Sequence, residues 1–393
     1  MYLNNSCCFV MISGTSRIIT WLREHYEFRF NIANHKMEFR PANTQEAYRF
    51  MSDNDFNSMK VALGIEDIPC SRETLRTIIF SDLWPQYNPY KLWLDSLPEW
   101  DGEDHISALA NTVHTDDDTY FHWCLRKWLV AFVGSLAQDE VVNQTAIIFC
   151  GGQGIGKSSW FRNIMPAELQ NYISSGYLQP KDKETLVQLS ELCLYNMDEV
   201  ENLKPANVEA IKEIMTKSSM YLRRAYTTLS SNYIRRCSFC GTANGINILH
   251  DITGNRRFLC QNVLSIDFQL TGVDLAQLYA QAFQLFRTGF QHWFDREEQM
   301  RVENHNQRFR ATSIEEDMVR TYFSPCQDTD EGAKRLQAVE ILSYLRDKVR
   351  GVSLSPETLG KIMNSMGFIK KKSGISKWVV RFNNVSQEPA DTL

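Results

Sequence analysis

The sequence TAIIFCGGQGIGKSS, residues 145–159, sets the architecture of this 393-residue chain. Its first six residues form a short apolar run, which is the length of a buried strand. The next eight, Gly151 to Ser158, fit the pattern G-x-x-x-x-G-K-[ST], whose glycines let backbone N–H groups curl around phosphates. A helix beginning at about Lys157 would direct its positive end at the same anion. Strand, loop and helix in this order predict a nucleoside triphosphate site, against the alternative of a chance glycine turn.

The residues of this loop have separate expected roles. Lys157 can reach the β- and γ-phosphates, and the hydroxyl of Ser158 can hold Mg²⁺. The residues expected to bind ATP are Gly151, Gly152, Gln153, Gly154, Ile155, Gly156, Lys157, Ser158 and Ser159.

Two further strands are expected to complete the site. A mostly apolar run, residues 192–197, ends in Asp198-Glu199. After a phosphate loop, such a pair predicts Asp198 as a ligand of Mg²⁺ and Glu199 as the residue that orients or deprotonates the attacking water. A third apolar strand, residues 237–243, leads to Asn244, whose side chain can position that water. The alternative for the acidic pair is a strand end exposed to solvent.

Arginines after these strands suggest contacts with a neighbouring subunit and with DNA. Arg256 and Arg257 are candidate arginine fingers, which stabilise charge on the transferring phosphoryl group. They follow the Asn244 strand too closely to fold back easily onto their own phosphate loop, so we expect a homo-oligomeric ring. Arg223 and Arg224 flank the polar turn of a predicted hairpin and are candidate nucleic-acid contacts.

The last part of the chain is predicted to be a winged helix. Segments with helical patterns are followed by two basic strands, residues 368–372 and 377–382, which flank a Ser-Gly turn. Lysines on a wing are an electrostatic footprint for phosphates. The alternative is a solvated basic turn on a protein-interaction module. The candidate nucleic-acid contacts of this wing are Lys370, Lys371, Lys372 and Lys377.

Length and composition indicate a multidomain globular protein. We expect a mainly helical N-terminal domain at residues 1–139, an ATPase domain at 140–305 and a winged-helix-like domain at 306–393. Within the first, residues 27–32 and 36–40 alternate like paired strands, and residues 120–136 have helical spacing.

The overall charge and the cysteines narrow the class of protein further. The net charge of −5 excludes a protein that is positively charged overall, so nucleic-acid contacts must come from local basic patches. No apolar run reaches the roughly 18 residues of a membrane helix. The ten scattered cysteines favour reduced thiols in a cytoplasmic protein.

Five motifs occur in an order and spacing that resemble the virulence-associated protein E family: GGQGIGKSS (151–159), YNMDE (195–199), RRAY (223–226), GTAN (241–244) and TGNRRF (253–258). The upstream segment NPYKLWLDSLPEWDGEDHI, residues 88–106, is also similar to that family. The similarity covers roughly residues 25–310, and the C-terminal segment resembles the domain that follows in members from Bacteroides-like bacteria. The resemblance implies a phage or mobile-element ATPase with an α/β P-loop core of the AAA+ or superfamily 3 helicase type. Such proteins act in DNA replication, often beside a primase.

The leading hypothesis is therefore an ATP-hydrolysing, DNA-associated motor that uses ATP and Mg²⁺ on single-stranded or forked DNA. A separate primase is a further partner that the resemblance implies. The runner-up is a nucleotide-gated DNA-binding switch or loader that does not unwind. A small-molecule kinase with the same phosphate loop is a third possibility, and it predicts a concave acceptor pocket and a mobile arginine lid. The Asp-Glu pair, the Asn244 strand and the predicted winged helix favour the first two.

Overall fold

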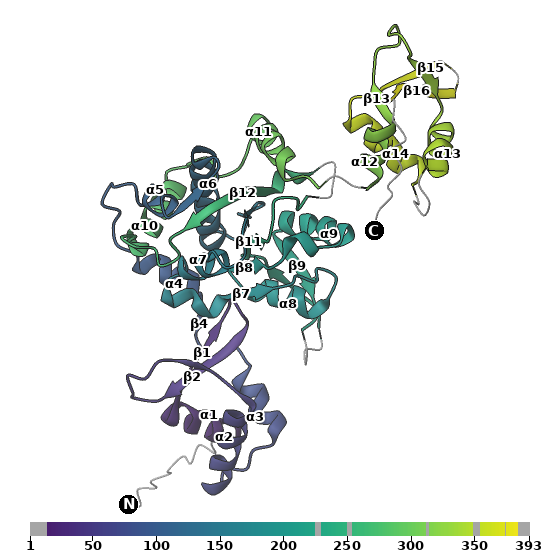
Figure 1. The fold of residues 1–393 in the computed structure, drawn as a ribbon. Helices are drawn as coiled ribbons and strands as arrows, with labels where there is room; N and C mark the ends of the chain where they lie inside the picture. The colour runs from purple at the N-terminus through teal and green to yellow at the C-terminus, as the bar shows by residue number, and fades with distance from the viewer. Residues whose placement is uncertain are drawn as a thin grey trace, which may run out of the picture.

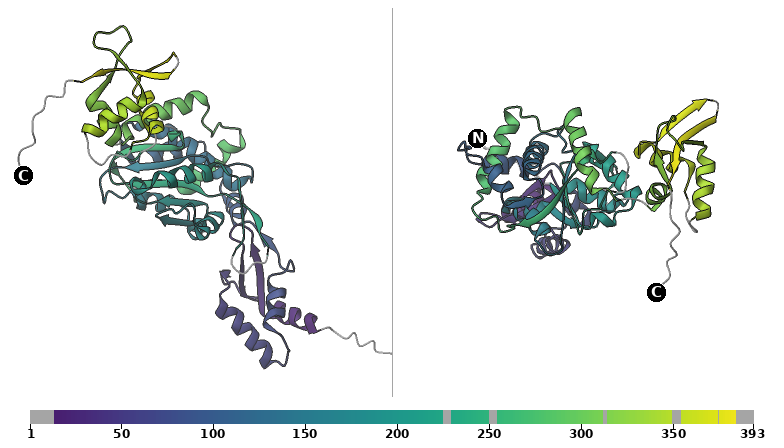
Figure 2. Two further views of the ribbon diagram at one scale, coloured as in Figure 1. Left: turned by 90° about the vertical axis from the view of Figure 1, so that its right-hand side faces the viewer. Right: turned by 45° about the horizontal axis from the view of Figure 1, so that its top comes forward.

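The computed structural model describes residues 14–224, 229–249, 254–311, 314–348, 354–373 and 375–383. Three lobes follow one another along the chain, and the small N-terminal and C-terminal lobes lie at different ends of the large central one (Figures 1 and 2). Among these residues, no helix is both long and apolar enough to cross a membrane.

The central lobe is built on a six-stranded sheet. Its strands, in spatial order, are β5 (Val113–Thr115), β12 (Phe258–Ile266), β6 (Ala146–Cys150), β11 (Ser238–Ala243), β8 (Leu194–Met197) and β7 (Ile173–Gly176). All neighbours are parallel except β5, which runs antiparallel to β12. Strand β6, which precedes the glycine-rich loop, and β8, which precedes Asp198, are thus separated by β11.

Helices cover both faces of this sheet, which explains why β6 is a continuous apolar run. Ile147 and Phe149 of β6 face one hydrophobic core, whereas Ile148 and Cys150 face the other. The first core includes residues of α4 (Pro89–Ser96), α5 (His105–Ala110), α6 (Asp118–Ala137), α7 (Lys157–Asn163) and α10 (Leu275–Arg287). The second includes residues of α8 (Lys183–Glu191) and α9 (Pro205–Thr216). The predicted helix at 120–136 is confirmed as part of α6.

The N-terminal lobe has its own sheet and core. Its elements are α1 (Gly14–His25), β1 (Tyr26–Asn31), β2 (Lys36–Pro41), β3 (Arg49–Phe50), α2 (Asp53–Ile65), α3 (Arg72–Ile79) and β4 (Gln86–Tyr87). Strands β1 and β2 pair antiparallel, which confirms the predicted pairing of residues 27–32 and 36–40. Phe28, Met37 and Phe39 alternate toward the three helices and form the core with them. In this lobe more residues lie in helices than in strands, and the helices pack against a four-stranded sheet.

Hydrophobic packing does not separate residues 89–137 from the central lobe. Helices α4, α5 and α6 belong to the first core of the central sheet, and β5 is the edge strand of that sheet. The domain limits at residues 139 and 305 stay predictions, and the packing favours assigning the chain from Pro89 onward to the central unit.

The C-terminal lobe contains α12 (Ile314–Tyr322), β13 (Phe323–Pro325), β14 (Lys334–Leu336), α13 (Ala338–Lys348), α14 (Pro356–Ser365), β15 (Ile369–Ser373) and β16 (Ile375–Phe382). Strands β15 and β16 form an antiparallel pair, which confirms the two basic strands expected from the sequence. Strand β16 also pairs with β13 and β14. One core of buried side chains joins these helices to β16.

Candidate active site

Three parallel strands bring most of the predicted site residues to one edge of the central sheet. β6, β8 and β11 end there, because the carboxyl ends of parallel strands meet at the same edge. A cavity of about 430 Å³ lies at this edge. The residues lining it are Gln153, Gly154, Gly156, Lys157, Ser158, Ser159, Asp198, Glu199, Thr242 and Asn244. Of the predicted ATP-binding residues, Gly151, Gly152 and Ile155 do not line it.

The loop between β6 and α7 requires glycine at several positions. Gly151, Gly154 and Gly156 have φ values of 145°, 83° and 97°, a region that side-chain-bearing residues rarely adopt. A Cβ added at Gly156 would also lie 2.6 Å from Cδ1 of Phe268. Gly156 is the N-cap of α7 and supplies no side-chain cap, so the first N–H groups of the helix are left to an anion.

Lys157 is held inside the loop by the loop's own backbone. Its Nζ donates to the carbonyl oxygens of Gly151 (3.0 Å) and Gly152 (2.6 Å), and the residue is 6% exposed. Burial lowers the pKa of Lys157, because the charged form loses solvation. Phosphate oxygens would give this ammonium group stronger partners than neutral carbonyls do. The position therefore fits a lysine that binds the phosphates of a nucleotide.

Two hydroxyl groups and one side-chain amide surround the carboxylate of Asp198. Its Oδ1 accepts hydrogen bonds from Ser158 Oγ (3.3 Å), Thr242 Oγ1 (3.3 Å) and Asn196 Nδ2 (2.8 Å). Hydroxyl and carboxylate oxygens are the ligands that Mg²⁺ prefers, so Ser158 and Asp198 fit the predicted metal role. Asn196 and Thr242 were not predicted from the sequence. Both are polar residues near the end of an otherwise apolar strand, and this pattern could have identified them in the sequence.

Glu199 and Asn244 have related expected roles but follow different strands. Glu199 has a left-handed backbone, φ 54°, and its Oε2 accepts from Asn202 Nδ2 at 3.1 Å. Such a conformation is uncommon outside glycine and often marks a functional position. The backbone N–H of Asn244 donates to Glu201 Oε1 at 2.9 Å. Glu201 is a further residue that was not predicted from the sequence.

The two candidate finger arginines lie at the amino ends of the parallel strands, opposite the cavity. Arg256 and Arg257 directly precede β12, whose first residue Phe258 pairs with Ala146, the first residue of β6. The glycine-rich loop begins only after Cys150, and the five residues of β6 span about 16 Å. The structure therefore does not bring these arginines to the cavity of their own chain.

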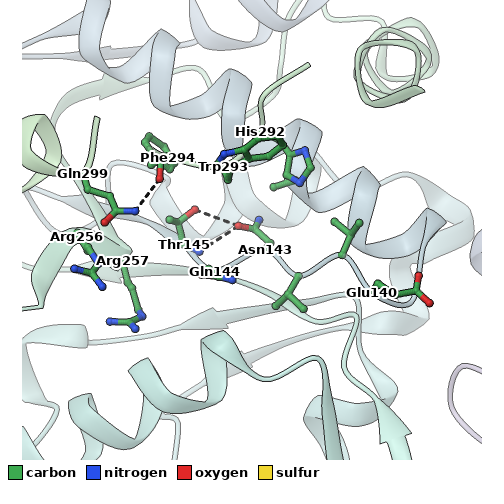
Figure 3. A pocket seen from close by; sticks show the side chains of 13 residues that line it. Glu140, Asn143, Gln144, Thr145, Arg256, Arg257, His292, Trp293, Phe294 and Gln299 are labelled. Carbon is green, nitrogen blue, oxygen red and sulfur yellow. Dashed lines mark hydrogen bonds between the residues drawn. The ribbon is translucent and has the colours of Figure 1, made fainter. Parts of the chain in front are cut away.

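Arg256 and Arg257 lie side by side in a separate pocket of about 500 Å³ (Figure 3). Asn143, Gln144 and Trp293 also line it. Arg256 is exposed and Arg257 is half-buried. Burial, followed by the charge of Arg256, lowers the pKa of Arg257. Within the described part of the chain, neither forms an ion pair with a carboxylate at 4.0 Å or less.

The predicted hairpin exists, but its two arginines differ. Strands β9 (Ser219–Leu222) and β10 (Ser231–Ile234) pair antiparallel, and Arg223 and Arg224 follow β9. Arg223 is exposed. Arg224 instead pairs with Glu191 and donates to the carbonyl oxygen of Asn34 at 3.0 Å, with its side chain 12% exposed. Arg224 thus ties the hairpin to α8 and the N-terminal lobe, which leaves few donors for a phosphate.

The lysines of the wing divide between its two faces. Lys371 lies directly opposite Lys377, so these two like charges share one face. Nζ of Lys370 lies 5.1 Å from the ring centroid of Trp378 on the other face. The side chain of Lys372 is outside the described residues. Asp328 pairs with Arg335, and the charge of Lys371 also helps to lower the pKa of Asp328, so an acidic group lies near the wing.

Comparisons with known proteins give one family. No curated protein matches the sequence. The structure is similar to the apo structure of the NrS-1 C-terminal region, at 13% identity and a TM-score of 0.48, over 94% of this chain and 98% of that one. An A form of the same region gives 12% identity and a TM-score of 0.45, over 93% and 98%. The virulence-associated protein E-like domain matches residues 94–311, 218 of the 393 residues. The chain therefore belongs to the virulence-associated protein E-like family.

Proposed function

We propose that this protein is an ATP-hydrolysing, DNA-associated motor with a P-loop core of the AAA+ or superfamily 3 helicase type. The observation that carries the proposal is the meeting of Lys157, Ser158, Asp198, Glu199 and Asn244 around one cavity. These residues come from three separate segments, and together they supply a cation for phosphate, oxygen ligands for Mg²⁺ and two polar groups for water.

Each residue would have a defined task in hydrolysis. Lys157 would leave the loop carbonyls and bind the β- and γ-phosphates. Ser158 and Asp198 would hold Mg²⁺, which when bound neutralises charge on those phosphates. Glu199 would orient the attacking water and accept its proton, and Asn244 would fix the position of that water.

The site is incomplete without a second copy of the chain. The described residues that line the cavity include no arginine. Arg256 and Arg257 lie instead at the opposite ends of the strands, where neither forms an ion pair of 4.0 Å or less with a described carboxylate. A ring in which these ends face the cavity of the next subunit would place cations beside the phosphates there. The exposed Trp293, at 58%, lines the same pocket and would be covered by that neighbour.

DNA would be bound through local basic patches. Arg223, exposed where the turn of the β9–β10 hairpin begins, is the candidate on the central lobe. On the C-terminal lobe, which we propose to be a winged helix, Lys371 and Lys377 are the candidates with the clearest common face. The alternative is that this lobe binds a protein partner and that the lysines are only solvated. In that case their replacement would not change DNA affinity.

The deciding experiment measures ATP turnover with and without single-stranded DNA, beside a strand-displacement assay. The wild type should hydrolyse ATP with Mg²⁺, and Lys157→Ala should abolish turnover without unfolding the protein. Lys60→Ala, on the exposed surface of α2, is the matched control. Wild-type turnover by Lys157→Ala would refute the site. Turnover without strand displacement would favour a nucleotide-gated switch or loader.

A further inference from the structure

Glu201 connects the two residues that would handle the attacking water. It lies on the single turn η2 (Val200–Asn202), which directly follows Glu199. Its Oε1 accepts a hydrogen bond from the backbone N–H of Asn244 at 2.9 Å. Asn244 is the first residue after β11, so this carboxylate joins the end of β11 to the turn after β8.

The second oxygen of Glu201 is in an unusual state. Oε2 is buried and has no hydrogen-bond partner among the described residues. A buried carboxylate oxygen without a partner is costly and calls for an explanation. The side chain of Glu201 does not line the cavity itself, so its contact with Asn244 is made from outside the cavity lining.

We infer that Glu201 is a positioning residue for ATP hydrolysis, which holds Asn244 at a fixed place relative to Glu199. The inference rests on the proposed ATPase function. Glu199 and Asn244 come from segments 45 positions apart in sequence, and neither contacts the other in any described hydrogen bond. Because a misplacement of about 1 Å can reduce turnover by about a hundredfold, a hydrogen bond that sets their spacing has a direct effect on rate.

Two substitutions separate the hydrogen bond from the charge. Glu201→Ala removes both, whereas Glu201→Gln keeps an oxygen that can accept from the Asn244 N–H. We expect Glu201→Ala to lower kcat by about 10–100-fold, the loss typical of a hydrogen bond to a charged group, with little change in ATP affinity. Glu201→Gln should keep kcat within about threefold of the wild type. Glu213→Ala, an exposed glutamate on α9 that pairs with Lys217, is the matched control.

Hydrogen exchange of the Asn244 amide tests the same contact without any activity measurement. This amide should exchange faster in Glu201→Ala and remain protected in Glu201→Gln. The inference is overturned if exchange is equal in wild type and Glu201→Ala, or if Glu201→Ala keeps wild-type kcat. If Glu201→Ala lowered ATP affinity and melting temperature together with kcat, the inference would be overturned in favour of a structural role. If the wild type hydrolysed no ATP, the proposed function would be refuted. The exchange rate of the Asn244 amide would still show whether Glu201 holds Asn244 through this hydrogen bond.

Discussion

Replacing Arg256 with alanine should stop ATP hydrolysis without preventing ATP binding. Arg256 precedes a strand whose first residue pairs with the start of β6, and the glycine-rich loop begins about 16 Å away at the other end of β6. That separation exceeds the reach of an arginine side chain, so any effect on phosphates must occur in a neighbouring subunit. An arginine finger typically contributes about 10³–10⁵ in turnover. Arg256 is exposed and Arg257 half-buried, so we expect the larger loss at Arg256.

Mixing two inactive variants gives the sharper test. Arg256→Ala keeps its own Lys157, and Lys157→Ala keeps its own Arg256. In randomly mixed rings at equal amounts, about one quarter of the interfaces pair an intact lysine with an intact arginine, so about one quarter of wild-type turnover should return. Arg17→Ala, on the exposed surface of α1, should behave as wild type and serves as the control. No recovery despite demonstrated subunit exchange, or full turnover by a dilute monomer, would refute this reasoning.

Four further outcomes are expected from the same structure. Glu199→Gln should still bind ATP but stall hydrolysis, and normal turnover would remove Glu199 from its role. Alanine at residues 370–372 should weaken DNA binding evenly across sequences and flatten the slope of log affinity against log salt by about 0.7–0.9 for each phosphate that is no longer neutralised; an unchanged slope would assign these lysines to another surface. Gly241→Ala should lower stability by about 1–3 kcal/mol in denaturant unfolding, because an added Cβ would lie 2.8 Å from Cγ2 of a valine; an unchanged midpoint would contradict this close packing. Burial, then the charge of Arg308, lowers the pKa of His305 to about 4, so between pH 6.5 and 4 the unfolded chain binds the proton first and the free energy of unfolding falls as the pH is lowered; His305→Gln should weaken this pH dependence in melting curves, and an identical dependence would exclude His305 as its source.

Features that depend on neighbouring residues were predictable from the sequence. The apolar run 145–150 and the glycines after it identify a strand, loop and helix, because periodicity and glycine conformations are local properties. The β1–β2 pair and the β15–β16 pair were predictable for the same reason, since each joins strands separated by a short turn. The acidic pair Asp198-Glu199 was recognisable from its place directly after an apolar run.

Contacts between distant segments were decided only by the tertiary structure. The order of the strands places β11 between β6 and β8, and this brings Thr242 to Asp198 and Glu201 to Asn244. The parallel pairing of β12 with β6 places Arg256 at the amino ends of the strands, away from the glycine-rich loop. Likewise, the ion pair between Arg224 and Glu191 depends on how the hairpin packs on α8. Strand order is set by the burial of two whole faces of a sheet, a property of the assembled core that no short stretch of sequence contains.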